Sequence, residues 1–526
     1  MSHQAEKYVL AFDLSTSGAK AAIVSAAGEV LGTEFEPDTL TLLPGGGAEQ
    51  DPALWWQRIK ATSLRLIERR LVPVDDIMAI SCTGQWSGAV ALDRDGNHLA
   101  NAMIWLDSRG APYVKQITDG WPRVQGYGLA KLIKWVRLTG GIPTHGGKDA
   151  IAKILYIKNE KPELYHATHK FLEPKDFINY KLTGRFAASY DSITLHWVTD
   201  NRRVDEVVYD RDLIRMSTID PAKLPELKRS VDVLSLIRPE VADEIGLNRQ
   251  VRVVTGSPDV QSAAIGAGAV NDFKANLYVG TSSWLTCHVP FKKLDLRHQI
   301  ASLPSSIPNR YLATNEQESA GACLNYLRDN VFCRNGQSRF NEQPDAMAEF
   351  NQLAREVPPG SNKLIFTPWL HGERTPVEDS SLRSCFFNQS LQTTKADMVR
   401  AVFEGVAYNS RWLLECMDRF TKRPLDNINA IGGGANSGLW CQIFADVMDR
   451  TIHQVKNPIQ ANLRGAAFIA AVGMEWMSFD DVPERIQIAA SYSPNPANRQ
   501  VYNKLYSAFR EIHKRNKSLF ADLNQE

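Results

Sequence analysis

Two segments about half a chain apart repeat one pattern: an apolar strand, a tight turn of small polar residues and a second apolar strand. The first runs over residues 9–24 and turns at Ser15-Thr-Ser-Gly18. The second runs over residues 275–289 and turns at Gly280-Thr-Ser-Ser283. Such turns leave backbone N–H groups and hydroxyls free to point at an anion. The repeat therefore predicts two lobes, with both turns facing a phosphate chain held between them.

The chain has 526 residues, more than one core normally supports, so we expect two domains, 1–268 and 269–526. The net charge is +1, and no basic excess predicts a nucleic-acid partner. Seven cysteines are scattered singly, as is typical of reduced thiols in a cytosol. The sequence opens with no apolar signal segment, and its longest apolar stretch, near Ala466–Met474, is too short to cross a bilayer. We therefore expect a cytoplasmic protein without a membrane partner.

Hydrophobic periodicity gives a coarse map of the elements. Three strands are predicted over residues 8–36, a helix over about 52–70 and a β-branched strand over 251–255. Residues 110–220 and the tail from about 480 to 526 are expected to be mainly helical. Alternating strands and helices of this kind predict an α/β fold.

The first hairpin carries the groups that a phosphate site needs. Asp13 ends its first strand, where a carboxylate can hold Mg²⁺ through waters. Ser15, Thr16 and Ser17 supply hydroxyls, and Lys20 adds a positive charge. An ordinary hairpin turn uses the same residue types, so the hairpin alone does not decide between a phosphate site and a plain turn.

The segment Gly256-Ser-Pro-Asp259 follows a strand and opens a helix of small residues. Ser257 and Pro258 are typical of an N-cap and a first-turn proline, which places Asp259 in the first helical turn. The positive end of the helix favours an ionised Asp259 at neutral pH. An ionised carboxylate at a cleft can take a proton from an attacking hydroxyl. Acidic residues also occur in first turns for stability alone, so that interpretation stays open.

A third glycine element, Gly432, Gly433 and Gly434, joins a strand to a helix that Asn436 or Ser437 can cap. Consecutive glycines would let an adenine or ribose lie flat against the backbone, whereas a plain strand-to-helix turn seldom needs three. Together with the two hairpins, this element predicts a nucleotide site in a cleft and favours a phosphotransferase.

Polar and aromatic residues lie at the ends of two further strands: Gln85, Trp86, Trp105 and Asp107. Flat apolar faces and amide or carboxylate edges suit a sugar. Most of the twelve tryptophans must nevertheless be core or interface residues, so this signal is weak by itself. The sequence holds no G-x-x-x-x-G-K-[ST], no strand-following G-x-G-x-x-G and no H-E-x-x-H.

Taken in order over residues 7–480, these segments resemble the FGGY family of carbohydrate kinases, and within it the xylulokinase group. The family's phosphate hairpin, D-x-G-T-S-G-x-K, is similar to Asp13–Lys20, and Gly256–Asp259 resembles the segment of its catalytic aspartate. The other resembling segments are Thr83–Gly88 and Ile104–Arg109 (sugar contacts), Lys153–Lys158 (first signature), Gly280–Ser282 (second phosphate loop), His371–Pro376 (G-E-R-T-P), Ala396–Met417 (second signature) and Ile431–Met448 (adenosine motif).

The resemblance implies two RNase H-like lobes of the hexokinase/actin type around a central cleft. It also implies Mg-ATP-dependent phosphorylation of a terminal hydroxyl on a small sugar or polyol, D-xylulose first. The partners would be the sugar and Mg-ATP, and family habit is compatible with a homodimer. The implied site residues are Asp259 as the base; Gln85, Trp86, Ser87, Trp105 and Asp107 for the sugar; Asp13 for the metal; and Ser15, Thr16, Ser17, Lys20, Gly280, Thr281, Ser282, Gly432, Gly433, Gly434, Asn436 and Ser437 for ATP.

The sequence departs from the family pattern mainly at the sugar. Xylulokinases usually have Gln-Met-His-Gly where this chain has Gln85-Trp-Ser-Gly88, so Trp86 and Ser87 change hydrogen bonding and pocket width. Ser15 also replaces a customary glycine. Glycerol kinases have Arg and Glu at the positions of Trp86 and Ser87, so glycerol is not expected.

Three alternatives to a D-xylulose kinase remain open from the sequence. One is a kinase for another ketose or polyol, such as L-xylulose, ribulose, a tetritol or a pentitol. Another is a non-catalytic sugar or nucleotide sensor, which would have no need of Asp259 as a base. The third is an actin- or chaperone-like ATPase, which would not need the sugar-facing segments at 83–88 and 104–109.

Overall fold

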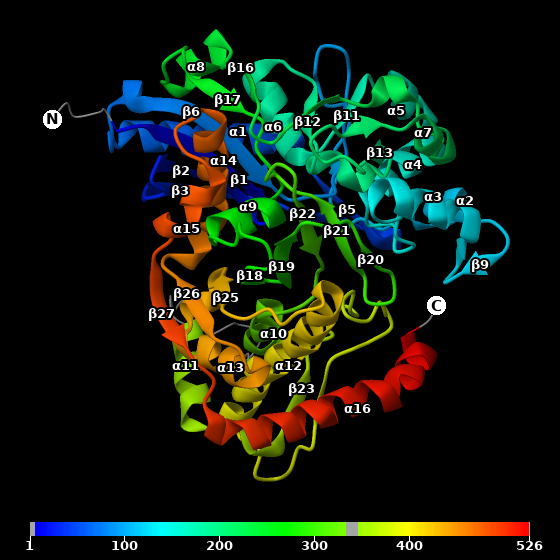
Figure 1. Ribbon diagram of the computed structural model, residues 1–526, viewed down its shortest axis with the longest axis vertical. Helices are drawn as coiled ribbons and strands as arrows, with labels where there is room; N and C mark the ends of the chain where they lie inside the picture. Colours follow the sequence, from blue (N-terminus) through cyan, green and yellow to red (C-terminus); the bar gives the residue numbers. More distant parts are fainter. Residues whose placement is uncertain (1–5, 333–345, 525–526) are drawn as a thin grey trace.

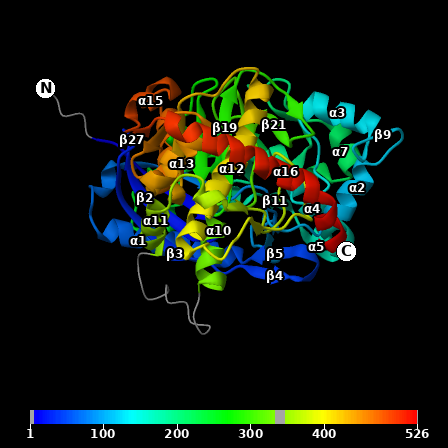
Figure 2. The same ribbon diagram turned by 90° about the horizontal axis from the view of Figure 1, so that it is seen from below.

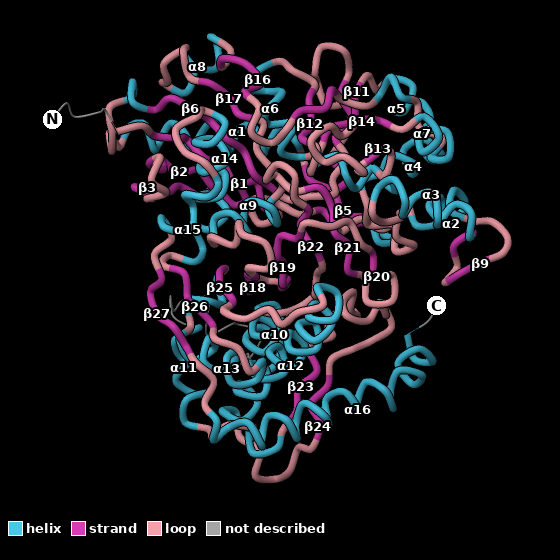
Figure 3. Tube along the Cα trace, viewed as in Figure 1, coloured by secondary structure: helices cyan, strands magenta, loops and turns pink. Residues whose placement is uncertain are grey.

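The computed structural model describes residues 6–332 and 346–524. Two lobes lie one above the other in Figure 1, each built on one large sheet with helices against its faces (Figures 1 and 3). The lobe drawn from blue to green comes from the first half of the chain, and the second half supplies most of the lower lobe.

The first sheet has six strands in the order β16-β17-β6-β1-β2-β3. β1, β2 and β3 form an antiparallel meander, and β6 and β17 run parallel to β1. This confirms the three strands predicted over residues 8–36. The strands are β1 (Tyr8–Ser15), β2 (Gly18–Ser25), β3 (Val30–Pro37), β6 (Ile77–Gly84), β16 (Val233–Leu236) and β17 (Arg252–Val254).

The alternating side chains of β1 enter two different cores. Leu10 and Phe12 belong to a cluster on the side of α1 (Pro52–Glu68), whereas Val9 and Ala11 belong to a cluster with α14 (Ala461–Gly473). Because helices cover both faces, β1 is buried along nearly its whole length. The sheet edge at which β1 ends is thereby fixed in position.

The second sheet repeats this arrangement. Its order is β20-β21-β22-β19-β18-β25-β26-β27, in which β22-β19-β18-β25-β26 matches β3-β2-β1-β6-β17 in order and direction. The repeat confirms the expected two-lobed α/β fold. The strands are β18 (Ala275–Val279), β19 (Ser283–Val289), β20 (Leu294–Asp295), β21 (Ile300–Pro304), β22 (Tyr311–Thr314), β25 (Ile428–Ile431), β26 (Ile452–Val455) and β27 (Ile488–Tyr492).

Helices complete the lower lobe. The long helix α12 (Lys395–Thr421) begins at a capping box formed by Thr394 and Asp397 and is mostly buried. In Figure 2, α16 (Arg499–Asn524) crosses the outside of α12 and α13 (Gly438–Met448), with which it is in contact. β27 lies within the tail that was expected to be helical; it pairs with β26 and extends the sheet by one edge strand.

Two glycines let the lobes approach closely. α14 comes from the second half of the chain but packs on β1, β6 and α9 (Asp259–Gly266) of the first lobe. A Cβ on Gly266 would lie 1.8 Å from the Ala461 carbonyl oxygen, and one on Gly465 would lie 1.9 Å from that of Ser262. The division at residue 268 stays a prediction, since α14 crosses it in space.

Residues 110–220 are helical in part and also contain short strands. The helices not yet named are α2 (Ala111–Thr118), α3 (Leu129–Thr139), α4 (Ala150–Glu160), α5 (Pro162–Ala167), α6 (Pro174–Thr183), α7 (Arg211–Ser217), α8 (Pro239–Ile245), α10 (Gly321–Tyr326), α11 (Ala346–Glu356) and α15 (Val482–Arg485). The paired short strands are β4 (Thr41–Leu43), β5 (Gly47–Gln50) and β8 (Ala102–Met103); β7 (Val90–Leu92) with β11 (Lys170–Leu172); β9 (Arg123–Val124) with β10 (Tyr127–Gly128); β12 (Ala187–Ser189) with β15 (Glu226–Lys228); β13 (Thr199–Asp200) with β14 (Val208–Tyr209); and β23 (Ile365–Thr367) with β24 (Cys385–Phe387). Among the described residues, no helix is long and apolar enough to span a membrane.

Candidate active site

The predicted site segments gather where parallel strands end. β1, β6 and β17 run in the same direction, so their carboxyl ends share one edge of the first sheet. The β1–β2 turn, Gln85 and the loop that leads to Asp259 all leave from that edge. In the second lobe, β18 and β25 are parallel and lead to Gly280 and Gly432. Crevices at such strand ends are the usual ligand sites of α/β proteins.

Asp13 has the environment that a metal-binding carboxylate needs. Its Oδ2 lies 3.6 Å from Nζ of Lys20, whereas its buried Oδ1 has no hydrogen-bond partner in the described part of the chain. The hydroxyl of Thr83, the residue opposite Asp13 on β6, is likewise buried and unpartnered there. Unpartnered buried oxygens cost free energy, so a ligand that fills the space beside them is favoured.

These atoms fit Mg²⁺, which commonly takes one or two protein carboxylates and completes its shell with water and phosphate oxygens. Within the described residues, no group of three His, Cys, Asp or Glu side chains could hold a metal. A metal at Asp13 would therefore depend on phosphate for much of its coordination.

Thr16 links the first phosphate turn to the predicted sugar segments. Its hydroxyl accepts a hydrogen bond of 2.8 Å from the indole Nε1–H of Trp105 and lies 3.4 Å from Oε1 of Gln85. The Thr16 carbonyl accepts a hydrogen bond of 2.9 Å from Nε2 of Gln50. Ser15 donates within the turn to the Gly18 carbonyl, 2.9 Å away, and Ser17 is exposed. The structure thus brings the predicted phosphate and sugar residues side by side.

Gln85, Trp86 and Ser87 follow β6 and are held by the protein itself. Nε2 of Gln85 donates to Oε1 of Gln50 at 2.8 Å. The indole N–H of Trp86 donates to the carbonyl of Ser192 at 2.9 Å, and the Ser87 hydroxyl donates to the carbonyl of Lys148 at 2.6 Å. The polar atoms at the two unusual positions are therefore already engaged.

Asp107 is fully buried, and its hydrogen bonds are structural. Its Oδ2 accepts from the Ala48 backbone N–H at 2.9 Å and from the Arg109 guanidinium at 2.7 and 3.0 Å. Arg109 also pairs with Glu49. This arrangement favours Asp107 as a residue that shapes the segment carrying Trp105.

Asp259 is the first residue of α9, but its local setting differs from the expectation. Pro258, not Ser257, occupies the N-cap position, and no side chain caps the helix. The prediction that Ser257 is the N-cap is therefore wrong; its hydroxyl donates to Asp191 instead. The carboxylate of Asp259 accepts a hydrogen bond of 2.8 Å from the Val260 N–H.

The pKa of Asp259 is raised from 3.8 to about 8. Removal from water is the largest cause, and the nearby charges of Asp13 and Glu316 add to it. These effects outweigh the helix end that was expected to favour the ionised form. The carboxylates of Asp13 in the first lobe and Glu316 in the second thus both act on Asp259.

The second phosphate turn and the triple glycine belong to the other lobe. Thr281 is exposed, and the backbone of the Gly280–Ser282 turn bonds to the segment that begins α10. Gly432 has φ +87°, and a Cβ there would lie 2.6 Å from the Val279 carbonyl. A Cβ on Gly433 would meet no described heavy atom within 4 Å. Gly433 therefore borders open space, as the predicted adenosine contact requires.

Of the two proposed caps of α13, Ser437 is the one that acts. Its hydroxyl accepts a hydrogen bond of 3.0 Å from the backbone N–H of Trp440. Asn436 is exposed. This leaves the Asn436 side chain on the surface of the predicted adenosine segment.

Sequence reasoning did not assign a cluster of charges beside Asp259. Arg374 pairs with Glu316 at 2.5 Å and with Glu318 at 3.2 Å, and Lys148 of the first lobe pairs with Glu318 at 3.0 Å. The Gly-Glu-Arg-Thr-Pro motif of the sequence includes Arg374, but the motif does not predict that Arg374 pairs with Glu316 and Glu318. No motif marks Glu316 or Glu318. The Lys148–Glu318 ion pair connects the two lobes.

Two family models match this chain, both described as the FGGY family of carbohydrate kinases: the N-terminal domain at residues 8–266 and the C-terminal domain at residues 275–474. The chain belongs to the FGGY family of carbohydrate kinases. It is accordingly an ATP-dependent sugar kinase.

Individual relatives of this FGGY kinase carry different sugar names. A xylulose kinase of Staphylococcus epidermidis is 30% identical, over 98% of this chain and 99% of the relative. Solved structures of a gluconate kinase and a ligand-bound xylulose kinase from Lactobacillus acidophilus each have a TM-score of 0.84 and 24% identity, covering 98% of this chain and 100% of theirs. The fold alone does not separate these sugars.

The raised pKa of Asp259 predicts that the site costs stability at high pH. The folded chain keeps a proton that the unfolded chain releases above 3.8. This cost is absent below the unfolded pKa and grows as the pH rises to the folded value. We expect Asp259→Asn to have a higher free energy of unfolding than wild type at high pH. The gain should be larger at about pH 8.5 than at about pH 5, by at least about 1 kcal/mol.

Urea unfolding of the two proteins without nucleotide or metal measures this difference. Asp212→Asn is a matched control, because Asp212 lies in the first turn of α7 and its pKa is lowered by Lys134. A gain from Asp259→Asn that is the same at both pH values would contradict the prediction.

Proposed function

We propose that this FGGY kinase transfers the γ-phosphoryl group of Mg-ATP to the terminal hydroxyl of a small ketose, D-xylulose first, giving D-xylulose 5-phosphate and ADP. The observation that carries the proposal is Asp259, a carboxylate in the first turn of α9 whose pKa is raised by loss of water contact and by the charges of Asp13 and Glu316. The choice of D-xylulose is supported by the 30% identity to a xylulose kinase over nearly the whole chain.

In this proposal Asp259 takes the proton of the C5 hydroxyl. The hydroxyl oxygen forms a bond to the γ-phosphorus while the bond between that phosphorus and the β–γ bridging oxygen breaks, and ADP leaves. A carboxylate whose pKa is raised towards the working pH is a stronger base than an ordinary aspartate, and its unprotonated fraction, which grows as the pH rises towards that pKa, takes the proton. Its pKa therefore suits the role.

The phosphates would lie between the two hairpin turns. Asp13 would hold Mg²⁺ through its unpartnered Oδ1, and the metal, when bound, would offset negative charge on the phosphate oxygens. Ser15, Thr16, Ser17 and Lys20 would approach the phosphates from the first lobe, and Gly280, Thr281 and Ser282 from the second. Gly432, Gly433, Gly434, Asn436 and Ser437 would border adenosine, with Gly433 facing open space.

The sugar would meet Gln85, Trp86, Ser87 and Trp105. Because the Trp86 N–H and the Ser87 hydroxyl both donate to carbonyls of the protein, Trp86 would offer the sugar mainly the apolar face of its ring and Ser87 no free donor. This observation favours a second candidate, an FGGY kinase for another ketose or a polyol. Such an acceptor would have to bind without hydrogen-bond donors from Trp86 and Ser87.

A panel of acceptors decides between the candidates. We expect ADP release with Mg-ATP to have its highest kcat/KM with D-xylulose among D-xylulose, L-xylulose, D- and L-ribulose, gluconate, glycerol, a tetritol and a pentitol. A coupled initial-rate assay measures each ratio. A higher ratio for another compound would replace D-xylulose. ATP turnover that no acceptor stimulates would contradict the kinase proposal and favour an ATPase or a sensor.

The role of Asp259 has its own test. Asp259→Asn should lower kcat by about 10³-fold or more, because the amide cannot accept the hydroxyl proton, while Mg-ATP binding changes little. Steady-state kinetics with the best acceptor and calorimetric titration with Mg-ATP measure both quantities. The control Asp212→Asn should keep wild-type kcat. Near wild-type kcat in Asp259→Asn would remove Asp259 as the base.

A further inference from the structure

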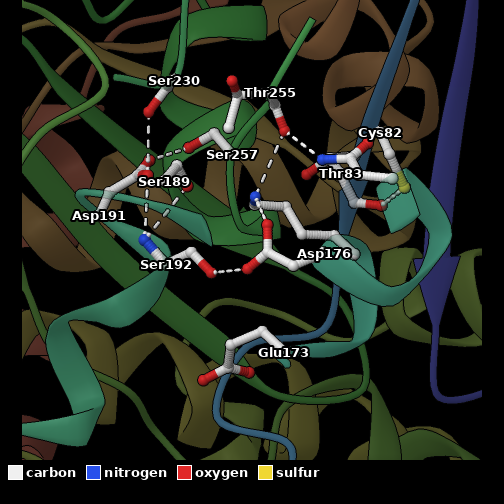
Figure 4. A network of polar contacts seen from close by, with 12 residues as sticks. Cys82, Thr83, Glu173, Asp176, Ser189, Asp191, Ser192, Ser230, Thr255 and Ser257 are labelled. Atoms are coloured by element: carbon white, nitrogen blue, oxygen red, sulfur yellow. Dashed lines mark hydrogen bonds and ion pairs between the residues drawn. The ribbon is translucent and has the colours of Figure 1, made fainter. Parts of the chain in front are cut away.

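The loop that carries Asp259 is held by a buried polar network (Figure 4). The carbonyl of Thr255 accepts hydrogen bonds from Nδ2 of Asn179 at 2.7 Å and from Nζ of Lys175 at 3.3 Å. The next residue, Gly256, donates its backbone N–H to the Ser230 carbonyl at 2.9 Å. The chain between β17 and α9 is therefore fixed on both sides before it reaches Asp259.

Asp191 is the centre of this network and is fully buried. Its Oδ1 accepts hydrogen bonds of 2.9 Å from the Ser192 backbone N–H and from the Ser230 hydroxyl. Its Oδ2 accepts from the hydroxyls of Ser257 and Ser306, the latter at 2.7 Å. A carboxylate with no nearby cation is costly to bury unless it is hydrogen-bonded in this way. In the described part of the chain Asp191 forms no ion pair, so its negative charge is stabilised by these four hydrogen-bond donors.

The two donors on Oδ2 come from different lobes. Ser257 lies two residues before Asp259, whereas Ser306 lies in the loop between β21 and β22 of the second sheet. Their hydroxyl oxygens are 2.5 Å apart. At the end of β21, just before this loop, the Pro304 carbonyl accepts a hydrogen bond of 2.9 Å from Nε2 of Gln261 in α9. Asp191 thus joins the segment before Asp259 to a fixed point on the second lobe.

The residue next to Asp191 reaches the sugar segment. The carbonyl of Ser192 accepts the indole N–H of Trp86, and its hydroxyl donates to Asp176 at 2.5 Å. Asp176 in turn pairs with Lys175, which contacts the carbonyl of Thr255. The pair Asp191–Ser192 therefore contacts the loops of both the predicted base and the predicted sugar wall.

We propose that Asp191 is a positioning residue for Asp259, which sets the base in place by holding Ser257 against Ser306 of the second lobe. The inference rests on the proposed role of Asp259. Asp191 touches neither the sugar nor ATP in this account. It acts through its hydrogen bond to Ser257. Because Asp191 also binds Ser306, the position of the base depends on the position of the second lobe. Displacing a reacting group by about 1 Å can cost about 10²-fold in rate.

Three serine variants separate positioning from simple stability. Ser257→Ala, Ser306→Ala and Ser230→Ala each remove one hydroxyl donor from the same carboxylate. Ser257 and Ser306 both donate to Oδ2 of Asp191 and so link the base loop to the second lobe. Ser230 donates to Oδ1. Ser230→Ala leaves in place the backbone carbonyl that holds Gly256, and it is the matched control.

We expect Ser257→Ala and Ser306→Ala to lower kcat about tenfold while KM for Mg-ATP changes less than about twofold. Ser230→Ala should keep kcat within about twofold of wild type, although all three variants lose similar thermal stability. Asp191→Asn, which retains one acceptor oxygen, should recover more kcat than Asp191→Ala. Steady-state kinetics measure these values, with the acceptor that has the highest kcat/KM in the panel and at a temperature well below the Tm of every variant.

Equal losses of kcat in all three serine variants, or wild-type kcat in Ser257→Ala and Ser306→Ala, would overturn the inference. Asp259→Asn, measured in parallel, identifies which claim has failed. If Asp259→Asn is active, the proposed base is wrong. If it is inactive while the serine variants do not differ, the base stands and Asp191 has only a structural role.

Discussion

The parallel pairing of β1 with β6, and of β6 with β17, is the interaction on which the site depends. It brings three strand ends to one edge, so that Asp13, Gln85 and the loop before Asp259 share a small region although they are far apart in sequence. The second sheet repeats the same order and presents its own turn and glycines. Burial of β1 between two helical layers keeps that edge in place.

The electrostatics of the cleft oppose folding and suit catalysis. Asp13, Asp259 and Glu316 bring negative charge together in a region with limited access to water, which raises the pKa of Asp259. Such an arrangement reduces stability in return for a reactive group, as is common at active sites. The Lys148–Glu318 and Arg374–Glu316 ion pairs offset part of this charge, and the first of them joins the two lobes.

The sequence was most informative where the signal is local. The hairpins, the glycine segment and the start of α9 are short patterns that local backbone preferences determine, and the two similar hairpins predicted the two lobes. Ser257 was misassigned because its partner, Asp191, is 66 residues away and no local rule reveals it. The loss of water contact at Asp259 and the charges of Asp13 and Glu316 that act on it are equally non-local, so the pKa of Asp259 could not be predicted from a helix end. β27 was missed because its pairing with β26, rather than its own sequence, makes it a strand.

The central claim is that two hairpin turns hold the triphosphate while Asp259 faces the sugar hydroxyl. A crystal structure of the chain with D-xylulose, Mg²⁺ and a non-hydrolysable ATP analogue tests it most directly. We expect the C5 hydroxyl oxygen about 3 Å from the Asp259 carboxylate, with the γ-phosphate between the Ser15–Gly18 and Gly280–Ser282 turns. A sugar hydroxyl that faces another group, or a triphosphate bound by one hairpin alone, would contradict it.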